Sequence, residues 1–171
     1  LSTVESDLTQ ASSFRPDFAF VSAYDLDGTM RAIYPRDPTI LNHNFAYRDW
    51  YKGESRDWKP YISEVYQTAV APYQLVVAIV VPIQDQSGTP IGILMAPYTL
   101  ETMSRHLVET KIAGAWTISL VDQHGHLSAR PNIDPYSAPI DLSGYEPVTL
   151  MGRGNTGCLL YTSDAADDLT R

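Results

Sequence analysis

Short apolar runs alternate with the same four-residue polar turn at three places along the chain. Each turn begins with aspartate and ends with glycine, and residues typical of β-strands flank it on both sides. An aspartate at the first position of a turn can hydrogen-bond its own backbone, and a glycine at the last position tolerates a positive φ. The pattern predicts three β-hairpins, with turns at residues 25–28, 85–88 and 122–125. Antiparallel pairing should therefore dominate, which argues against a parallel, doubly wound sheet.

Helical patterns are fewer. Residues 1–11 have the pattern of the end of an amphipathic helix, and residues 47–53 predict a short helical turn. The strongest helix is predicted over residues 100–111, where Thr99 can cap the first turn and apolar residues recur on one face. Another short helical turn is predicted over residues 147–151.

These elements predict an α+β protein made of two modules. After the end of an N-terminal helix at residues 1–13, residues 14–111 form a module with a five-stranded antiparallel sheet flanked by helices. A second module begins at residue 112 with its own hairpin and stops near residue 157, so we expect it to be truncated. Because both modules begin with the Asp-x-x-Gly hairpin, the sequence indicates a duplication.

The composition narrows the class of protein. The chain has 171 residues, enough for one domain or slightly more, and 44% of them are hydrophobic. Its net charge of −8 argues against wrapping nucleic acid, which needs a basic face. No apolar run approaches the roughly 18 residues of a membrane span. The N-terminus has no signal-peptide pattern and no initial Met, so we expect a piece of a longer protein.

The last residues have a different character. Residues 158–167 resemble the translation of a sequencing adapter, which predicts a non-native tail over residues 158–171; an acidic C-terminal helix is the alternative. That tail accounts for −2 of the net charge and for the one cysteine, so the remaining chain carries −6 and is free of cysteine. The absence of cysteine suits an extracytoplasmic domain, in which stray disulfides could form.

The candidate chemistry lies between residues 45 and 98, where one cation and several aromatic residues precede a buried sheet. A guanidinium can grip a carboxylate through two parallel hydrogen bonds, and tyrosine and tryptophan add apolar contact with one polar group each. The candidate ligand-binding residues are Arg48, Trp50, Tyr51, Tyr61, Tyr66 and Tyr98. Two alternatives stay open: Arg48 could pair with Asp49, Asp57 or Glu64, and Trp50 could belong to the core.

The order of several motifs resembles the double Cache family, the extracytoplasmic sensor domains of bacterial chemoreceptors, sensor kinases and cyclic-dinucleotide enzymes. The resemblance covers roughly residues 14–157. It implies a long N-terminal helix followed by two PAS-like modules, of which the membrane-distal one usually holds the ligand. The motifs that carry it are Ala-Tyr-Asp-Leu-Asp-Gly (23–28), Tyr-Arg-Asp-Trp-Tyr (47–51), Pro-Tyr-Ile-Ser-Glu-Val-Tyr (60–66), Val-Val-Pro-Ile-Gln-Asp-Gln-Ser-Gly (80–88) and Leu-Val-Asp-Gln-His-Gly-His-Leu (120–127).

The resemblance also implies a function and a site. In amino-acid-binding members an Arg-x-Trp-Tyr motif holds the ligand carboxylate, which Arg48, Trp50 and Tyr51 match, and a later tyrosine matches Tyr66 or Tyr61. The family's aspartate for the ligand ammonium aligns with Pro97, which cannot accept that hydrogen bond. We therefore expect a small carboxylate without an amine, or another polar metabolite.

Further expectations concern partners and location. The domain is expected on the periplasmic or extracellular side of a cell membrane, which it would meet only through flanking helices outside this sequence. The N-terminal helix could also join two copies into a homodimer. No cofactor is expected, no spacing of the four histidines suits a metal site, and neither enzymatic activity nor nucleic-acid binding is expected.

The sequence leaves two other functions open. The chain could be a structural or dimerisation module without a ligand, in which case Trp50, Tyr51 and Tyr66 would interlock and leave no cavity. Alternatively, Asp-Leu-Asp-Gly-Thr at residues 25–29 matches the nucleophile motif of haloacid-dehalogenase-type phosphatases. Those enzymes require a parallel sheet and downstream magnesium ligands, whereas this motif leads into a returning strand.

Overall fold

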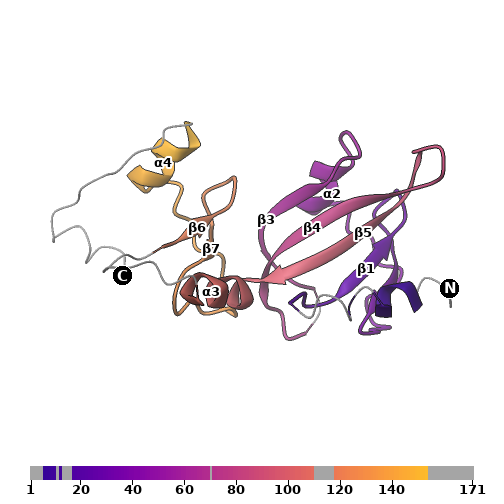
Figure 1. The fold of residues 1–171 in the computed structure, drawn as a ribbon, viewed down its shortest axis with the longest axis horizontal. Helices are drawn as coiled ribbons and strands as arrows, with labels where there is room; N and C mark the ends of the chain where they lie inside the picture. Colours follow the sequence, from indigo (N-terminus) through magenta and orange to yellow (C-terminus); the bar gives the residue numbers. More distant parts are fainter. Residues whose placement is uncertain (1–5, 11, 13–16, 70, 110–117, 154–171) are drawn as a thin grey trace.

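The computed structural model describes residues 6–10, 12, 17–69, 71–109 and 118–153. Its main element is a five-stranded sheet in which every neighbouring pair is antiparallel. The strand order is β2-β1-β5-β4-β3 (Figure 1). The strands are β1 (Val21–Tyr24), β2 (Met30–Tyr34), β3 (Tyr61–Gln67), β4 (Leu75–Gln84) and β5 (Pro90–Thr99). The predicted α+β class and five-stranded antiparallel sheet are thus confirmed.

The three predicted turns adopt the same geometry. Their last residues, Gly28, Gly88 and Gly125, have φ values of 82°, 82° and 86°. In the first turn, the Gly28 amide donates to the Asp25 carbonyl at 3.0 Å, and the other two turns repeat this bond. Positive φ is the conformation that glycine adopts without steric cost, so local chemistry sets where the strands reverse.

The helices follow the predicted positions closely. They are α2 (Asp49–Glu54), α3 (Leu100–Glu109) and α4 (Glu146–Gly152). At the start of α3, Thr99 Oγ1 accepts a hydrogen bond from the Thr102 amide at 3.1 Å, which confirms the predicted cap. Residues 6–10 and 12 are helical, whereas the rest of the predicted N-terminal helix, the predicted module boundary near residue 111 and the predicted tail lie outside the described residues.

The two faces of the sheet carry separate apolar clusters, because successive strand residues point to opposite sides. On one face, Leu8 of the N-terminal helical segment packs with Val21, Ala23 and Ala32. The other face is covered by Trp50 of α2 and by the segment that joins β2 to α2. Its cluster consists of Phe20, Tyr24, Met30, Ile33, Ile40, Phe45, Trp50, Ala78, Val80, Ile93 and Met95.

A small second sheet, β6 (Leu120–Val121) and β7 (Leu127–Ala129), lies with α3 and α4 at one end of the molecule (Figure 1). It packs on the main sheet through a third apolar cluster, and the Leu75 amide donates to the Pro135 carbonyl at 2.8 Å. The cluster therefore joins the two predicted modules directly. Its buried members are Val65, Leu75, Val77, Leu100, Leu127 and Ile133.

A bulge in β3 provides another polar link between the two parts. The pairing of the edge strand β3 with β4 shifts between Ile62 and Val65, and the amides of Glu64 and Val65 bond side chains there. Two aspartates supply the acceptors. Asp49 Oδ2 of α2 accepts from the Glu64 amide at 2.8 Å, and Asp122 Oδ2 of the second hairpin accepts from the Val65 amide at 2.7 Å.

Replacing Asp122 tests this link. Asp122→Ala removes the acceptor of the Val65 amide, so hydrogen exchange at that amide should accelerate. The free energy of unfolding should fall by about 1–3 kcal/mol, the usual cost of a buried donor left without a partner.

Asp85→Ala is the matched control. Asp85 Oδ1 accepts from the amides of its own turn, at Ser87 and Thr89, as Asp122 Oδ1 does at His124 and His126. In the described contacts Asp85 makes no bond to the second sheet, so its loss should leave Val65 exchange unchanged. Equal acceleration in both variants would show that the turn, rather than the link, matters.

Candidate functional site

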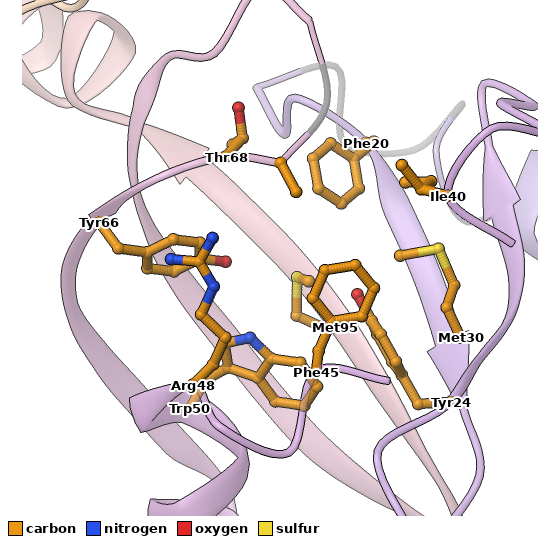
Figure 2. Close-up of a pocket in the computed structure, with 11 residues that line it drawn as sticks. Phe20, Tyr24, Met30, Ile40, Phe45, Arg48, Trp50, Tyr66, Thr68 and Met95 are labelled. Atoms are coloured by element: carbon orange, nitrogen blue, oxygen red, sulfur yellow. The ribbon is translucent and has the colours of Figure 1, made fainter. Parts of the chain in front are cut away.

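A hollow lies between the main sheet and the segment that carries α2 (Figure 2). Its empty volume is about 290 Å³ including its open mouth, of which only about 20 Å³ can hold the centre of a water-sized sphere. That is room for about one water molecule. It is lined by Phe20, Tyr24, Met30, Ile40, Phe45, Arg48, Trp50, Tyr66, Thr68, Ala69 and Met95.

Arg48 supplies the one formal charge among the residues that line the hollow. Its guanidinium carbon lies 4.8 Å from the centre of the Tyr66 ring and 5.2 Å from that of Tyr47, and Nη2 donates to the Gln67 carbonyl at 3.3 Å. Stacking on rings positions the cation without neutralising it. The guanidinium therefore keeps N–H groups from which a carboxylate could accept hydrogen bonds.

The three acids that could have paired with Arg48 interact elsewhere. Asp49 accepts from the Tyr61 hydroxyl and the Glu64 amide, and Asp57 pairs with Lys59 at 3.1 Å. Glu64 lies 4.0 Å from His124. Within the described part of the chain, no carboxylate lies within ion-pair distance of Arg48.

Aromatic rings form the wall opposite the guanidinium. Trp50 is 1% exposed, and its ring centre lies 4.7 Å from that of Tyr24. Burial raises the pKa of both the Tyr24 and the Tyr66 hydroxyls, so both stay neutral over the ordinary pH range. Ser22 Oγ donates to the Tyr24 hydroxyl oxygen at 3.1 Å. The hollow is thus apolar, with one cation and neutral hydroxyl groups.

The structure brings together half of the predicted site residues. Arg48, Trp50 and Tyr66 line the hollow. The other three tyrosines are not among its lining residues, and their hydroxyls form hydrogen bonds elsewhere. A ligand-binding role for any of the six candidate residues stays a prediction. Tyr51 donates to the Leu26 carbonyl at 2.9 Å, Tyr61 to Asp49 at 3.2 Å, and Tyr98 bonds His106 Nδ1 at 2.7 Å.

Sequence reasoning missed most of the apolar wall. The missed residues come from strands and loops far apart in the chain, so no local motif marks them. The alternation of side chains along a strand offers a partial signal. Tyr24 of β1 and Met95 of β5 both occupy positions on the face that α2 covers. Among the described residues that line the hollow, none is acidic.

Glu54 is an unexpected feature of α2. It lies one helical turn after Trp50, is 0% exposed, and neither carboxylate oxygen has a hydrogen-bond partner. Burial raises the pKa of Glu54 to about 7. An unpaired buried carboxylate is costly, so the folded state favours its neutral form.

The Asp25 motif that resembles a phosphatase nucleophile lies in the antiparallel turn between β1 and β2. Asp25 Oδ2 accepts from Arg31 Nε at 2.6 Å at an exposed position. Among the described residues, no cluster of three or more His, Cys, Asp and Glu side chains could hold a metal ion. This geometry lacks the parallel sheet and the ligand set that the phosphatase alternative requires.

Comparison with solved structures defines the class of protein whose fold this chain shares, namely extracellular ligand-binding domains of receptors. This confirms the predicted Cache-type, PAS-like sensor fold. No protein-family model matches the chain, and no curated protein does. None of the helices in the described ranges is long and apolar enough to span a membrane.

Three structures illustrate the likeness. The ligand-binding domain of the Pseudomonas aeruginosa PAO1 amino acid chemoreceptor PctB, in complex with L-Gln, has a TM-score of 0.65 at 19% identity, over 99% of this chain and 81% of that chain. The ligand-binding domain of the Pseudomonas fluorescens chemoreceptor CtaA, in complex with L-valine, has a TM-score of 0.67 at 19% identity, over 85% and 63%. The extracellular domain of a histidine kinase, rpHK1S-Z16, has a TM-score of 0.67 at 16% identity, over 87% and 61%. The chain thus spans less than two thirds of the last two proteins.

Glu54 generates a prediction about pH. Its pKa lies above the ordinary value of 4.5 in the folded protein, at about 7, so the folded state holds the proton more tightly. Stability from this group is complete below about pH 4.5 and is lost as the pH rises to about 7, by at most about 3 kcal/mol. Glu54→Gln should abolish that part of the fall, measured by urea unfolding from about pH 4 to about pH 8.

The exposed Glu101 provides the control, because Glu101→Gln should leave the fall in place. The readout is the slope of the free energy of unfolding against pH. The buried amide of the Gln variant lowers that free energy equally at every pH, so it does not change the slope. If Glu54→Gln and the unmodified protein gave parallel curves, Glu54 would be charged and paired in the folded state.

Proposed function

We propose that this chain is the extracytoplasmic sensing domain of a bacterial transmembrane receptor, a chemoreceptor, sensor kinase or cyclic-dinucleotide enzyme, and that it binds a small carboxylate in the hollow at Arg48. One observation carries the proposal. The Arg48 guanidinium is fixed by the rings of Tyr47 and Tyr66, faces an apolar cavity, and is not paired with any carboxylate in the described residues. An anionic ligand would supply the missing partner.

The lack of acids among the described lining residues of the hollow supports one ligand class. PctB and CtaA were solved with the amino acids L-Gln and L-valine, each of which carries an ammonium as well as a carboxylate. An ammonium in this hollow would be desolvated without a carboxylate partner, at a cost of several kcal/mol in similar burials. The rest of the lining is apolar or aromatic. The proposed ligand is therefore a carboxylate with an apolar chain and no amine.

The hydrogen bonds around β3 connect this site with the second sheet. Arg48 is followed directly by Asp49, which binds the bulge in β3, and Tyr66 follows Val65, which binds Asp122. A carboxylate that draws Arg48 and Tyr66 together would shift the balance between arrangements of this bulge. Signal transmission is then a population shift set by the ligand's differential affinity for the two arrangements.

The small size of the hollow is the one observation that favours the alternative, a structural or dimerisation module without a ligand. A cavity that holds about one water is what a packed module would also leave. The two functions differ in whether any carboxylate raises the melting temperature.

The test uses three compounds with the same carbon skeleton: hexanoate, norleucine and hexylamine. Hexanoate should raise the melting temperature most, norleucine less because of its ammonium, and hexylamine not at all. Arg48→Ala should weaken hexanoate binding by about tenfold or more, the usual effect of losing a charge-assisted hydrogen bond.

Arg31→Ala is the matched control for the loss of charge. Arg31 is about half exposed, pairs with Asp25 and does not line the hollow, so the variant should bind hexanoate normally. Normal hexanoate binding by Arg48→Ala would refute the site. A melting temperature that none of the carboxylates changes would favour the structural alternative.

A further inference from the structure

The hollow alone is too small for the ligand class proposed for it. About 20 Å³ of the hollow is open to the centre of a water-sized sphere, and by the same measure one water molecule needs about 10–15 Å³. The carboxylate group itself would fill this space. An apolar chain attached to it needs room that lies outside the hollow.

Such room lies directly beside it. A groove with an empty volume of about 720 Å³, of which about 300 Å³ admits the centre of a water-sized sphere, is bounded by three segments. Its described lining residues lie directly before β1, at and just after the end of β2, and between β3 and β4. The smaller of these volumes, about 300 Å³, is at the lower end of the usual range for small-molecule pockets.

Phe20 and Thr68 line both the hollow and the groove, so they form the partition between them. Both are buried, and Figure 2 shows Phe20 between Thr68 and Ile40 at one end of the hollow. The Thr68 amide donates to the Gln74 carbonyl at 2.9 Å, which fixes the backbone on that side. Phe20 precedes β1, and a rotation of its ring would join the two spaces.

The two compartments differ in chemistry. The hollow places Arg48 among aromatic and aliphatic groups, whereas the groove has a polar rim at Arg36, Asp37 and Gln74 beside apolar walls. The alkyl chain of a ligand whose carboxylate binds Arg48 would pass Phe20 and end at the polar rim of the groove.

We infer that the hollow and the groove form one binding site, with Phe20 as the residue that sets chain length, and that the ligand is a linear monocarboxylate longer than the hollow can hold. This inference rests on the proposed function, because it assumes the carboxylate at Arg48. It adds a second compartment and the residue that determines specificity.

The experiment compares the affinities of acetate, butanoate, hexanoate and octanoate, by calorimetry, in the unmodified protein and in four variants. Phe20→Ala removes the partition and should raise the ratio of octanoate to acetate affinity by about tenfold, and Phe20→Trp should lower it by a similar factor. Ala71→Trp fills the groove without touching the hollow, so it should weaken octanoate by about tenfold and leave acetate unchanged. Ratios between ligands are insensitive to a loss of overall stability.

Ile40→Ala distinguishes the effect of enlarging the hollow from the effect of connecting the hollow with the groove. Ile40 lines the hollow but not the groove, so its truncation should favour butanoate and leave the octanoate ratio unchanged. Equal effects of Phe20→Ala and Ile40→Ala, or normal octanoate binding by Ala71→Trp, would overturn the joined site while leaving the carboxylate at Arg48 intact. If the unmodified protein bound none of the four acids, the proposed function would fail and this inference with it.

Discussion

The guanidinium of Arg48 is held at the edge of an apolar hollow by the rings of Tyr47 and Tyr66, and this arrangement determines what the rest of the site can do. A cation over an aromatic face gains about 0.5–2 kcal/mol, which is enough to fix its position but not to replace an anion. The neighbouring acids bond other groups, so no carboxylate in the described ranges of the chain matches this charge. We propose that the hollow selects negative charge through this one side chain.

The β3 bulge connects the segment that carries the proposed site with the second hairpin. At the bulge the amides of the consecutive residues Glu64 and Val65 bond Asp49 and Asp122 instead of a neighbouring strand. One aspartate belongs to the helix beside Arg48 and the other to the second sheet. Two consecutive residues of the bulge therefore contact both parts of the molecule.

Local chemistry made much of the fold predictable, because each Asp-x-x-Gly turn is stabilised by its own residues. The same holds for α2, which places Trp50 toward the sheet. Tyr51, the next residue, points elsewhere because successive helical positions are about 100° apart. The faces of Tyr61 and Tyr98 depend on strand register, which a single bulge changes. Phe20 could not be assigned, because its role depends on two loops that no motif marks.

The central claim is that Arg48 receives the carboxylate of a ligand whose chain leaves the hollow past Phe20. A crystal structure of the protein with 6-bromohexanoate tests it most directly, because anomalous scattering locates the bromine independently of the carboxylate. We expect the carboxylate oxygens within hydrogen-bonding distance of the Arg48 guanidinium and the bromine in the groove beside Ala71. A bound carboxylate elsewhere, or an Arg48 side chain that pairs with a carboxylate of the protein, would contradict the account.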